Sequence, residues 1–306
     1  MNSTFKKVCI IGLGLIGGSI GLAMKRSKIS NQIIGFARSN STLKKAIELG
    51  LVDKVKDNLE DAVNDCDLII LATPLSTFKK LVEEMSPFLK KDCIITDTGS
   101  AKLSVIEDLR GILPNNVEFI PGHPIAGTEE SGPDAGFAEL FDNRWCILTP
   151  TEENSSNAID LIKEFWESIG SKVEIMDPLH HDKVLAITSH IPHLIAFNIV
   201  GTANNLANVT EKEVVKYSAG GFRDFTRIAA SDPKMWSDIF TYNSEAVLEM
   251  LELFSNDLAK LKAAVIKKDS DLLFSNFEKT REVRKNIIDA GQEESDVDFG
   301  RKKSEE

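Results

Sequence analysis

The chain has 306 residues, of which 42% are hydrophobic and 27% charged, so it is too apolar for a disordered protein and long enough for two domains. Its 47 acidic and 36 basic side chains give a net charge of −11, which argues against general affinity for nucleic acid or for an anionic membrane. The four cysteines lie far apart in apolar runs, which predicts reduced, buried thiols and neither a metal site nor a disulfide framework. The first residues lack the basic and apolar regions of a signal peptide, so we expect a cytoplasmic protein.

The spacing of apolar residues divides the chain into two halves. Between Lys7 and Asp177, short β-rich runs alternate with helical stretches, which predicts an α/β fold with a doubly wound parallel sheet. Beyond that point the pattern is helical, so we expect a sheet domain at 1–177, an all-α helical domain at 178–291 and a disordered acidic tail at 292–306. The predicted strands are Val8–Ile11, Ile33–Phe36, Leu68–Ala72, Cys93–Thr96, Glu118–Pro121, Cys146–Thr149 and Val173–Met176.

A turn with the spacing Gly-x-Gly-x-x-Gly follows the first strand and opens a helix. Glycines at this spacing allow a tight turn, close approach of the backbone to a pyrophosphate and close packing of helix on strand, while the helix N–H groups bind the anion. A Rossmann-type dinucleotide-binding site is therefore predicted, the alternative being a glycine turn with no ligand. Its residues are Gly12, Gly14, Leu15, Ile16 and Gly17.

The end of the second strand bears on the choice of cofactor. NAD-binding sites usually present an acidic residue to the ribose at this place, where the chain has Ala37. Arg38 and Ser39 follow, a cation and a hydroxyl suited to a 2′-phosphate, so NADP is slightly favoured over NAD; the alternative is that Arg38 is merely solvated. Thr73, directly after a later strand, is assigned to the same cofactor site.

Two further motifs, at 97–102 and 122–124, each follow a predicted strand and should lie at the carboxyl edge of the sheet. His123 is then expected to face the cofactor cleft. A neutral imidazole there can accept a proton from a substrate hydroxyl while hydride leaves the same carbon, and a neighbouring hydroxyl such as Ser100 could orient it. A lone histidine is also often structural, so this pattern alone leaves both interpretations open.

The clearest helix of the first half places apolar residues from Ala158 to Ile169 on one face and should end at Gly170. In the second half, the apolar stretch Val184–Val200 is interrupted by polar residues, which predicts a buried core helix rather than a membrane span. Ser189 and His193 are four residues apart on this helix and share a face.

A glycine-started aromatic segment from Gly220 contains Arg223 and Arg227. Either arginine is suited to hold a carboxylate through paired donors, and an arginine bound to a neighbouring acid or to a helix end explains the pattern equally well. Later apolar residues, spaced four and three apart, form either a seam for another helix or an ordinary core face. They are Val247, Leu251, Phe254, Leu258, Leu261 and Val265.

Three motifs together resemble the prephenate/arogenate (cyclohexadienyl) dehydrogenase family of tyrosine biosynthesis. They are the runs Gly122–Gly132, Ser189–His193 and Gly220–Ala229, and the resemblance extends over roughly Lys7 to Gly291. It implies a Rossmann domain joined to a helical domain that forms a homodimer, which the apolar seam would serve. It also implies an NAD(P)-dependent oxidative decarboxylation of prephenate to 4-hydroxyphenylpyruvate, of arogenate to tyrosine, or of both.

The resemblance further implies roles for single residues. His123 corresponds to the catalytic group that hydrogen-bonds the ring hydroxyl, and Ser100 to the hydroxyl that supports it and approaches the nicotinamide. His193 would help to place the substrate, and Arg227 would hold its carboxylate. The other implied substrate-binding residues are Thr128, Ser189 and, at the mouth of the pocket, Glu129.

Two other functions share parts of this pattern. A dehydrogenase of 3-hydroxy acids has the same two-domain architecture, although the His-Pro-Ile-Ala-Gly-Thr motif directly after a strand argues against it. In a non-catalytic dinucleotide sensor, His123, His193 and Arg227 would be packing residues. The departure from the family pattern is Ala37, where many relatives carry an acid; it concerns the cofactor and leaves the chemistry unchanged.

Overall fold

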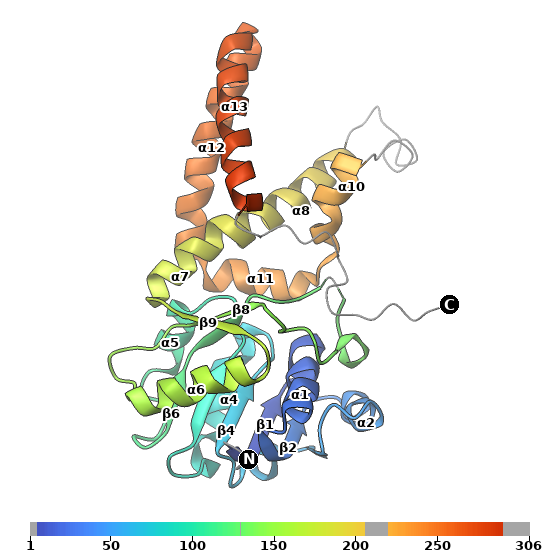
Figure 1. Ribbon diagram of the computed structural model, residues 1–306, viewed down its shortest axis with the longest axis vertical. Coiled ribbons are helices and arrows are strands. Elements are labelled where there is room, and N and C mark those ends of the chain that lie inside the picture. Colours follow the sequence, from blue (N-terminus) through green and yellow to red (C-terminus); the bar gives the residue numbers. More distant parts are fainter. Residues whose placement is uncertain (1–4, 129, 206–219, 290–306) are drawn as a thin grey trace.

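The computed structural model describes residues 5–128, 130–205 and 220–289. Figure 1 shows an α/β domain below and a helical domain above it, with α11 (Pro233–Tyr242) lying across the top of the sheet domain. The predicted fold, a Rossmann-type parallel sheet followed by an all-α domain, is confirmed.

Six parallel strands form the main sheet: β1 (Phe5–Ile11), β2 (Ser30–Phe36), β3 (Lys54–Lys56), β4 (Leu68–Leu71), β5 (Ile94–Asp97) and β6 (Glu118–Ile120). Their order is β3-β2-β1-β4-β5-β6, so the direction of winding reverses between β1 and β4. The loops that follow these two strands diverge at the reversal, and open α/β sheets bind ligands in the crevice between such loops.

Helices cover both faces of this sheet: α1 (Leu15–Ser27), α2 (Asn40–Glu48), α3 (Leu59–Val63), α4 (Phe78–Met85), α5 (Leu103–Leu109) and α6 (Ser156–Ser168). Because alternate strand residues point to opposite faces, Val8 and Ile10 of β1 pack in one cluster with α1, α2 and α6, whereas Cys9 and Ile11 pack in the other with α3, α4 and α5. The chain leaves α6 at Gly170 with φ of +107°, as predicted. All four cysteines are free and buried, also as predicted.

A second, three-stranded sheet lies beside the first, and the sequence analysis did not separate the two. It contains β7 (Gly122–Pro124), β8 (Trp145–Leu148) and β9 (Lys172–Ile175), with β7 antiparallel to β8. The prediction that the last two of these strands extend the parallel sheet was wrong, and β3 and β7 were missed because three residues carry too little periodicity. Pro121 has no N–H to continue the ladder of β6, so His123 lies in a strand of its own.

The helical domain begins with α7 (Pro178–Leu185), one π-helical turn (Ala186–His190) and α8 (Ile191–Asn204). Pro192 has no N–H for the carbonyl four residues earlier and its ring crowds that oxygen, which accounts for the wider turn. The remaining helices are α10 (Gly220–Thr226), the 3-10 turn Arg227–Ala230, α11, α12 (Ser244–Lys267) and α13 (Ser270–Asp289); short 3-10 turns also occur at Leu75–Thr77, Ser86–Phe88 and Pro133–Ala135.

The continuous helix from Pro178 to Asn204 is, among the described residues, the one long and apolar enough to cross a membrane by length and composition, and 28% of its most apolar window is buried. Ile191 and Ala196 are buried against the protein, whereas Ile187 and Ile199 are exposed. The expected buried core helix is therefore buried along only one side in the single chain.

The predicted seam on α12 is likewise buried in one part and exposed in another. Val247 is buried and packs with Ala186 and Ile191, whereas Leu258 and Val265 are 53% and 61% exposed. Figure 1 shows that the outer part of α12 and the whole of α13 project from the body of the molecule as a hairpin. The first half of the seam therefore packs on the helical domain, whereas the outer half contacts α13 and keeps much of its apolar surface exposed.

A buried ion pair fixes the second sheet to the first. Lys102 Nζ lies 2.5 Å from Asp97 Oδ2 and donates a hydrogen bond of 2.7 Å to the carbonyl of Gly122, while Asp97 Oδ1 accepts a bond of 3.0 Å from the N–H of Gly122. Both charged side chains have no exposed surface. The ion pair therefore holds both polar backbone groups of the residue that precedes His123.

Replacement of Lys102 by Met should destabilise the protein by about 3 to 5 kcal/mol, because it leaves a buried carboxylate without its partner. The free energy of unfolding, measured by urea titration with circular dichroism, tests this. Lys80→Met is the matched control, since Lys80 forms only an exposed pair with Glu84 and its loss should leave stability nearly unchanged. Equal stability of the two variants would contradict a structural role for the buried pair.

Candidate active site

The glycine-rich turn lies where the winding of the sheet reverses, and the backbone leaves room there for a ligand. Gly12 has φ of +100°, and a Cβ on it would lie 2.4 Å from the carbonyl oxygen of Ala72. A Cβ on Gly17 would lie 1.9 Å from the oxygen of Gly12, so both positions require glycine for packing. A Cβ on Gly14 would meet nothing within 4 Å, so its open side fits the close approach of a pyrophosphate.

The amino terminus of α1 faces this opening, and no side chain of a described residue caps it. The N-cap is Gly14, which has no side chain. The first turn begins with Leu15 and Ile16 and carries no acidic residue. Thr73 lies beside the turn, since its methyl group is 2.8 Å from a Cβ built on Gly12, and its hydroxyl bonds to Thr77 at 2.7 Å. These residues fit a dinucleotide whose phosphates sit on the helix terminus.

The residues proposed to distinguish the two cofactors follow β2 at the same edge. Ala37 is half-buried and packs on the core, whereas Arg38 is exposed and forms no ion pair with any described residue. Ser39 caps α2 by accepting a hydrogen bond of 3.4 Å from the N–H of Thr42. A cation and a hydroxyl thus follow β2, and the residue at the place of the usual acid is an alanine.

His123 lies in β7 with only 7% of its surface exposed, at the contact between the two domains. Its Nδ1 is 2.9 Å from Nε2 of His181, and Nδ1 of His181 is 2.8 Å from Oδ1 of Asp182. Asp182 also accepts hydrogen bonds from the N–H groups of Lys102 (2.9 Å) and Leu103 (3.0 Å). A hydrogen-bonded chain from the helical domain therefore ends on the imidazole of the sheet domain.

His181 and Asp182 are functional candidates that the sequence analysis missed. The available signal was the run His180-His181-Asp182 in the first turn of the helix that opens the second domain. Ser100, which was expected to orient His123, is half-buried at the end of the same sheet edge and makes no hydrogen bond to a described residue. The ring nitrogen Nδ1 of His123 is occupied by His181 instead.

Burial favours the neutral form of the imidazoles of His123 and His181. It lowers the pKa of His123 well below 6.5, and the neighbouring His181, Lys102 and His190 lower it further. Burial also lowers the pKa of His181, although the carboxylate of Asp182 opposes this change. A neutral imidazole has one free lone pair, so His123 is suited to accept a proton at neutral pH.

The helical wall of the site brings together three of the predicted residues. His193 Nδ1 donates a hydrogen bond of 2.8 Å to the carbonyl of Ser189, and its ring stacks on Trp236 with centroids 3.7 Å apart. Burial lowers the pKa of His193, and the positive charge of Arg227 lowers it further. Arg227 opens the 3-10 turn that packs on α8, the helix of His193. Arg223, the alternative arginine, is exposed and pairs with its neighbour Asp224 at 3.3 Å.

His190 supports this wall from inside the protein. Burial lowers its pKa to about 4, and its Nδ1 lies 3.1 Å from the side-chain amide of Asn243. The same amide donates a hydrogen bond of 2.9 Å to the carbonyl of Asp182. The π turn that contains His190 is therefore tied to the helix that orients His123.

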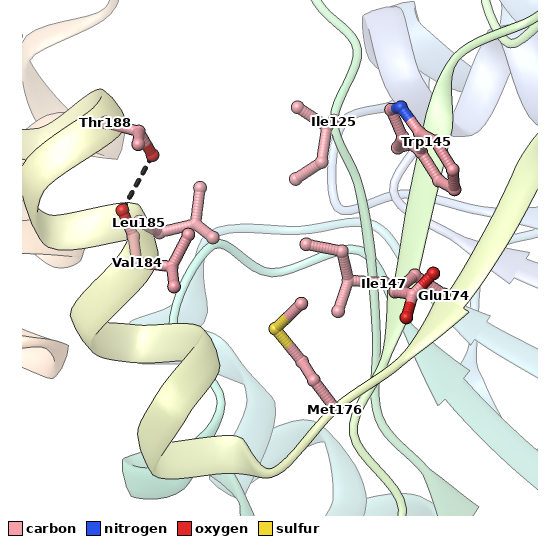
Figure 2. Close-up of a pocket in the computed structure, with 8 residues that line it drawn as sticks. All are labelled: Ile125, Trp145, Ile147, Glu174, Met176, Val184, Leu185 and Thr188. Atoms are coloured by element: carbon pink, nitrogen blue, oxygen red, sulfur yellow. Dashed lines mark hydrogen bonds between the residues drawn. The ribbon is translucent and has the colours of Figure 1, made fainter.

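An apolar groove of about 290 Å³ lies between the second sheet and the first helix of the helical domain, and Ile147, which lines it, is the strand partner of His123. Figure 2 shows Val184, Leu185 and Thr188 on one wall; facing them are Ile125, Trp145, Ile147, Glu174 and Met176. Thr128 is half-buried farther along the same loop and accepts a bond of 3.2 Å from the N–H of Glu130. Glu129 lies outside the described residues, and no cluster of three metal-ligating side chains occurs among those described.

This arrangement has the parts of a dehydrogenase site. A neutral imidazole can take a hydroxyl proton, the Rossmann turn can hold a dinucleotide, and the helical domain carries His193 and Arg227, whose side chains are of types that can bind an anion. Two domains meet at these groups, as is common in ligand sites.

Comparisons with known proteins agree with this geometry. Residues 20–175 match the nucleotide-binding domain of prephenate dehydrogenase, and residues 177–279 match the dimerization domain of prephenate dehydrogenase. The chain is 43% identical to cyclohexadienyl dehydrogenase of Zymomonas mobilis, over 92% of this chain and 96% of the relative.

Two solved structures resemble the whole chain. Prephenate dehydrogenase from A. aeolicus in complex with hydroxyphenyl propionate and NAD+ superposes with a TM-score of 0.86 at 36% identity, covering 92% of this chain and 98% of that one. Synechocystis arogenate dehydrogenase superposes with a TM-score of 0.75 at 28% identity, covering 92% and 99% of the two chains. The chain is therefore an oxidoreductase that belongs to the prephenate dehydrogenase family.

Proposed function

We propose that the chain catalyses the NAD(P)-dependent oxidative decarboxylation of prephenate, of arogenate or of both, in tyrosine biosynthesis. The observation that carries this proposal is the buried, neutral imidazole of His123 at the contact between a dinucleotide-binding domain and a helical domain. A bound nicotinamide would accept the hydride from the hydroxyl-bearing ring carbon. His123 takes up the proton of the ring hydroxyl; loss of the ring carboxylate as carbon dioxide then leaves an aromatic ring, whose oxygen regains a proton to give the phenol.

The substrate would lie between the two domains. Arg227 is proposed to hold a carboxylate, since a guanidinium pairs with it through two donors, and His193 and Ser189 to place the substrate on the same wall. Thr128, Glu129 and Ser100 complete the proposed site from the sheet domain. The protein supplies orientation and charge placement rather than covalent catalysis.

For the cofactor, we favour NADP slightly over NAD. The support is the sequence Ala37-Arg38-Ser39 at the end of β2, which has an exposed cation with no ion pair to a described residue and lacks an acid for the ribose hydroxyls. Gly12, Gly14, Leu15, Ile16, Gly17 and Thr73 would hold the rest of the dinucleotide.

We further infer a homodimer through the helical domain, acting in the cytoplasm. The support is the outer hairpin, whose two helices contact each other and still leave apolar side chains exposed; they include Leu258, Val265, Ile266, Phe274 and Phe277, each more than half exposed. A second copy of the hairpin would cover this surface.

The function is tested by following the absorbance of reduced cofactor with prephenate, arogenate and a simple 3-hydroxy acid. Turnover is expected with prephenate, arogenate or both. His123→Asn should bind substrate nearly normally and lower kcat about 100-fold or more, because it removes a general base. Turnover of the 3-hydroxy acid alone, or of none of the three despite cofactor binding, would contradict the proposal.

The pH dependence of kcat/KM reports the proton acceptor in the free enzyme. Since burial, His181, Lys102 and His190 all lower the pKa of His123, the neutral form persists below the ordinary value of 6.5. Activity should therefore remain on its plateau at pH 6.5 and fall only at more acidic pH, while circular dichroism verifies that the protein is still folded. An acid limb centred at or above pH 6.5 would exclude His123 as the group that titrates.

The cofactor preference is tested by comparing Michaelis constants. The wild-type KM should be lower for NADP than for NAD. Arg38→Ala should raise the KM for NADP about tenfold, in line with the loss of one charged hydrogen bond, and leave the KM for NAD nearly unchanged, so each cofactor is the control for the other. A wild-type preference for NAD, or equal effects on both constants, would contradict the assignment of Arg38.

A further inference from the structure

We propose that His181 and Asp182 form a relay that fixes the proton of His123 on Nδ1 and so leaves Nε2 as the basic atom that meets the substrate hydroxyl. Both are positioning residues, because they act through His123 and are not proposed to touch substrate. The inference rests on the proposed function and deepens it: it states which atom of the imidazole is the base and why.

Asp182 is buried and forms the inner end of the relay. Its two oxygens accept from the N–H groups of Lys102 and Leu103 and lie 2.8 Å from Nδ1 of His181. An ionised carboxylate has acceptors and no donor, so the proton between Asp182 and His181 is carried by Nδ1 of the imidazole.

A neutral imidazole carries one proton and one nitrogen lone pair. With its single proton on Nδ1, His181 presents a lone pair at Nε2, which lies 2.9 Å from Nδ1 of His123. His123 must therefore donate from Nδ1, and its own lone pair is on Nε2. That atom has no hydrogen-bond partner among the described residues, so it is free for a substrate hydroxyl.

The opposite arrangement is unfavourable at two places. If His181 carried its proton on Nε2, the lone pair of its Nδ1 would face a carboxylate oxygen at 2.8 Å with no proton between them. His123 would then carry its own proton on Nε2 and have no basic atom for the substrate. Since His181 has no exposed surface, water cannot relieve this repulsion.

The relay also accommodates the charge that forms during the reaction. When Nε2 of His123 takes a proton, the ring becomes a cation whose Nδ1–H already points along the chain toward the carboxylate of Asp182. The backbone of Asp182 is held by Asn243, and Gly122 beside His123 is held by the buried ion pair, so neither end needs to reorganise. The base thus depends on a group from each domain.

The protonation state is measured directly by long-range ¹H–¹⁵N correlation spectra of protein labelled with ¹⁵N-histidine, which distinguish the two tautomers and the cation. The chain has five histidines, so the spectrum can be assigned by single substitutions. At neutral pH, His123 and His181 are both expected as Nδ1–H tautomers. A proton on Nε2 of His123, or a doubly protonated ring, in the wild-type protein would overturn the proposal, whatever the enzyme's substrate.

Substitution of His181 separates the relay from simple packing. His181→Leu fills the space but removes the acceptor, so His123 should become a mixture of tautomers and kcat should fall about 10- to 100-fold with little change in KM. His181→Gln offers an oxygen to His123 and an N–H to Asp182, and should keep the Nδ1–H tautomer and most of the activity. His180→Leu is the matched control, because His180 is the exposed neighbour on the same helix and should behave as wild type.

The outcomes distinguish the relay from the proposed function. Equal kcat in His181→Leu and wild type, with loss of activity in His123→Asn, would reject the relay and leave the proposed function intact. Equal losses in the Leu and Gln variants, with an unchanged tautomer of His123, would assign His181 a packing role and also reject it. If the Leu variant does not fold, the wild-type spectrum and the Gln variant still decide.

Discussion

The buried ion pair between Lys102 and Asp97 is the interaction on which the arrangement of the site depends. Two charges without exposed surface are tolerated because each is paired and also hydrogen-bonded to the backbone of Gly122. The strand that bears His123 has only three residues and a correspondingly short ladder with β8, and the ion pair adds two hydrogen bonds to Gly122 at its start. Burial of Lys102 costs desolvation free energy, and the same lysine holds the backbone of the residue that precedes His123.

Buried carboxylates that accept hydrogen bonds from the backbone also occur where the helical domain meets the sheet domain. Asp182 of α7 accepts from two backbone N–H groups of the sheet domain, and Asp238 of α11 accepts from the backbone and hydroxyl of Ser76 near the cofactor loop. Trp236 and Ile239 add apolar contact beside these bonds. Carboxylates from two helices of the helical domain therefore tie it to the sheet domain.

The local charge of the helical wall is opposite in sign to the net charge of the chain. The net charge of −11 would repel an anionic substrate, yet the helical wall presents Arg227 beside a histidine whose pKa burial and that arginine both lower. His193 consequently contributes hydrogen bonding and stacking on Trp236 rather than positive charge at neutral pH. In the proposed site, attraction for the anion would thus rest on the guanidinium and orientation on neutral groups.

Local pattern in the sequence determined the Rossmann turn, the alternation of strands and helices, the helix that ends at Gly170 and the all-α second half, because each depends on neighbours along the chain. It also singled out His123, His193 and Arg227 as residue types suited to the chemistry. The second sheet, the half-exposed seam on α12 and the partners of His123 were decided only by the tertiary structure. His181 lies 58 residues from His123 in the chain, and no periodicity records which distant side chain a fold will bring within 2.9 Å of an imidazole.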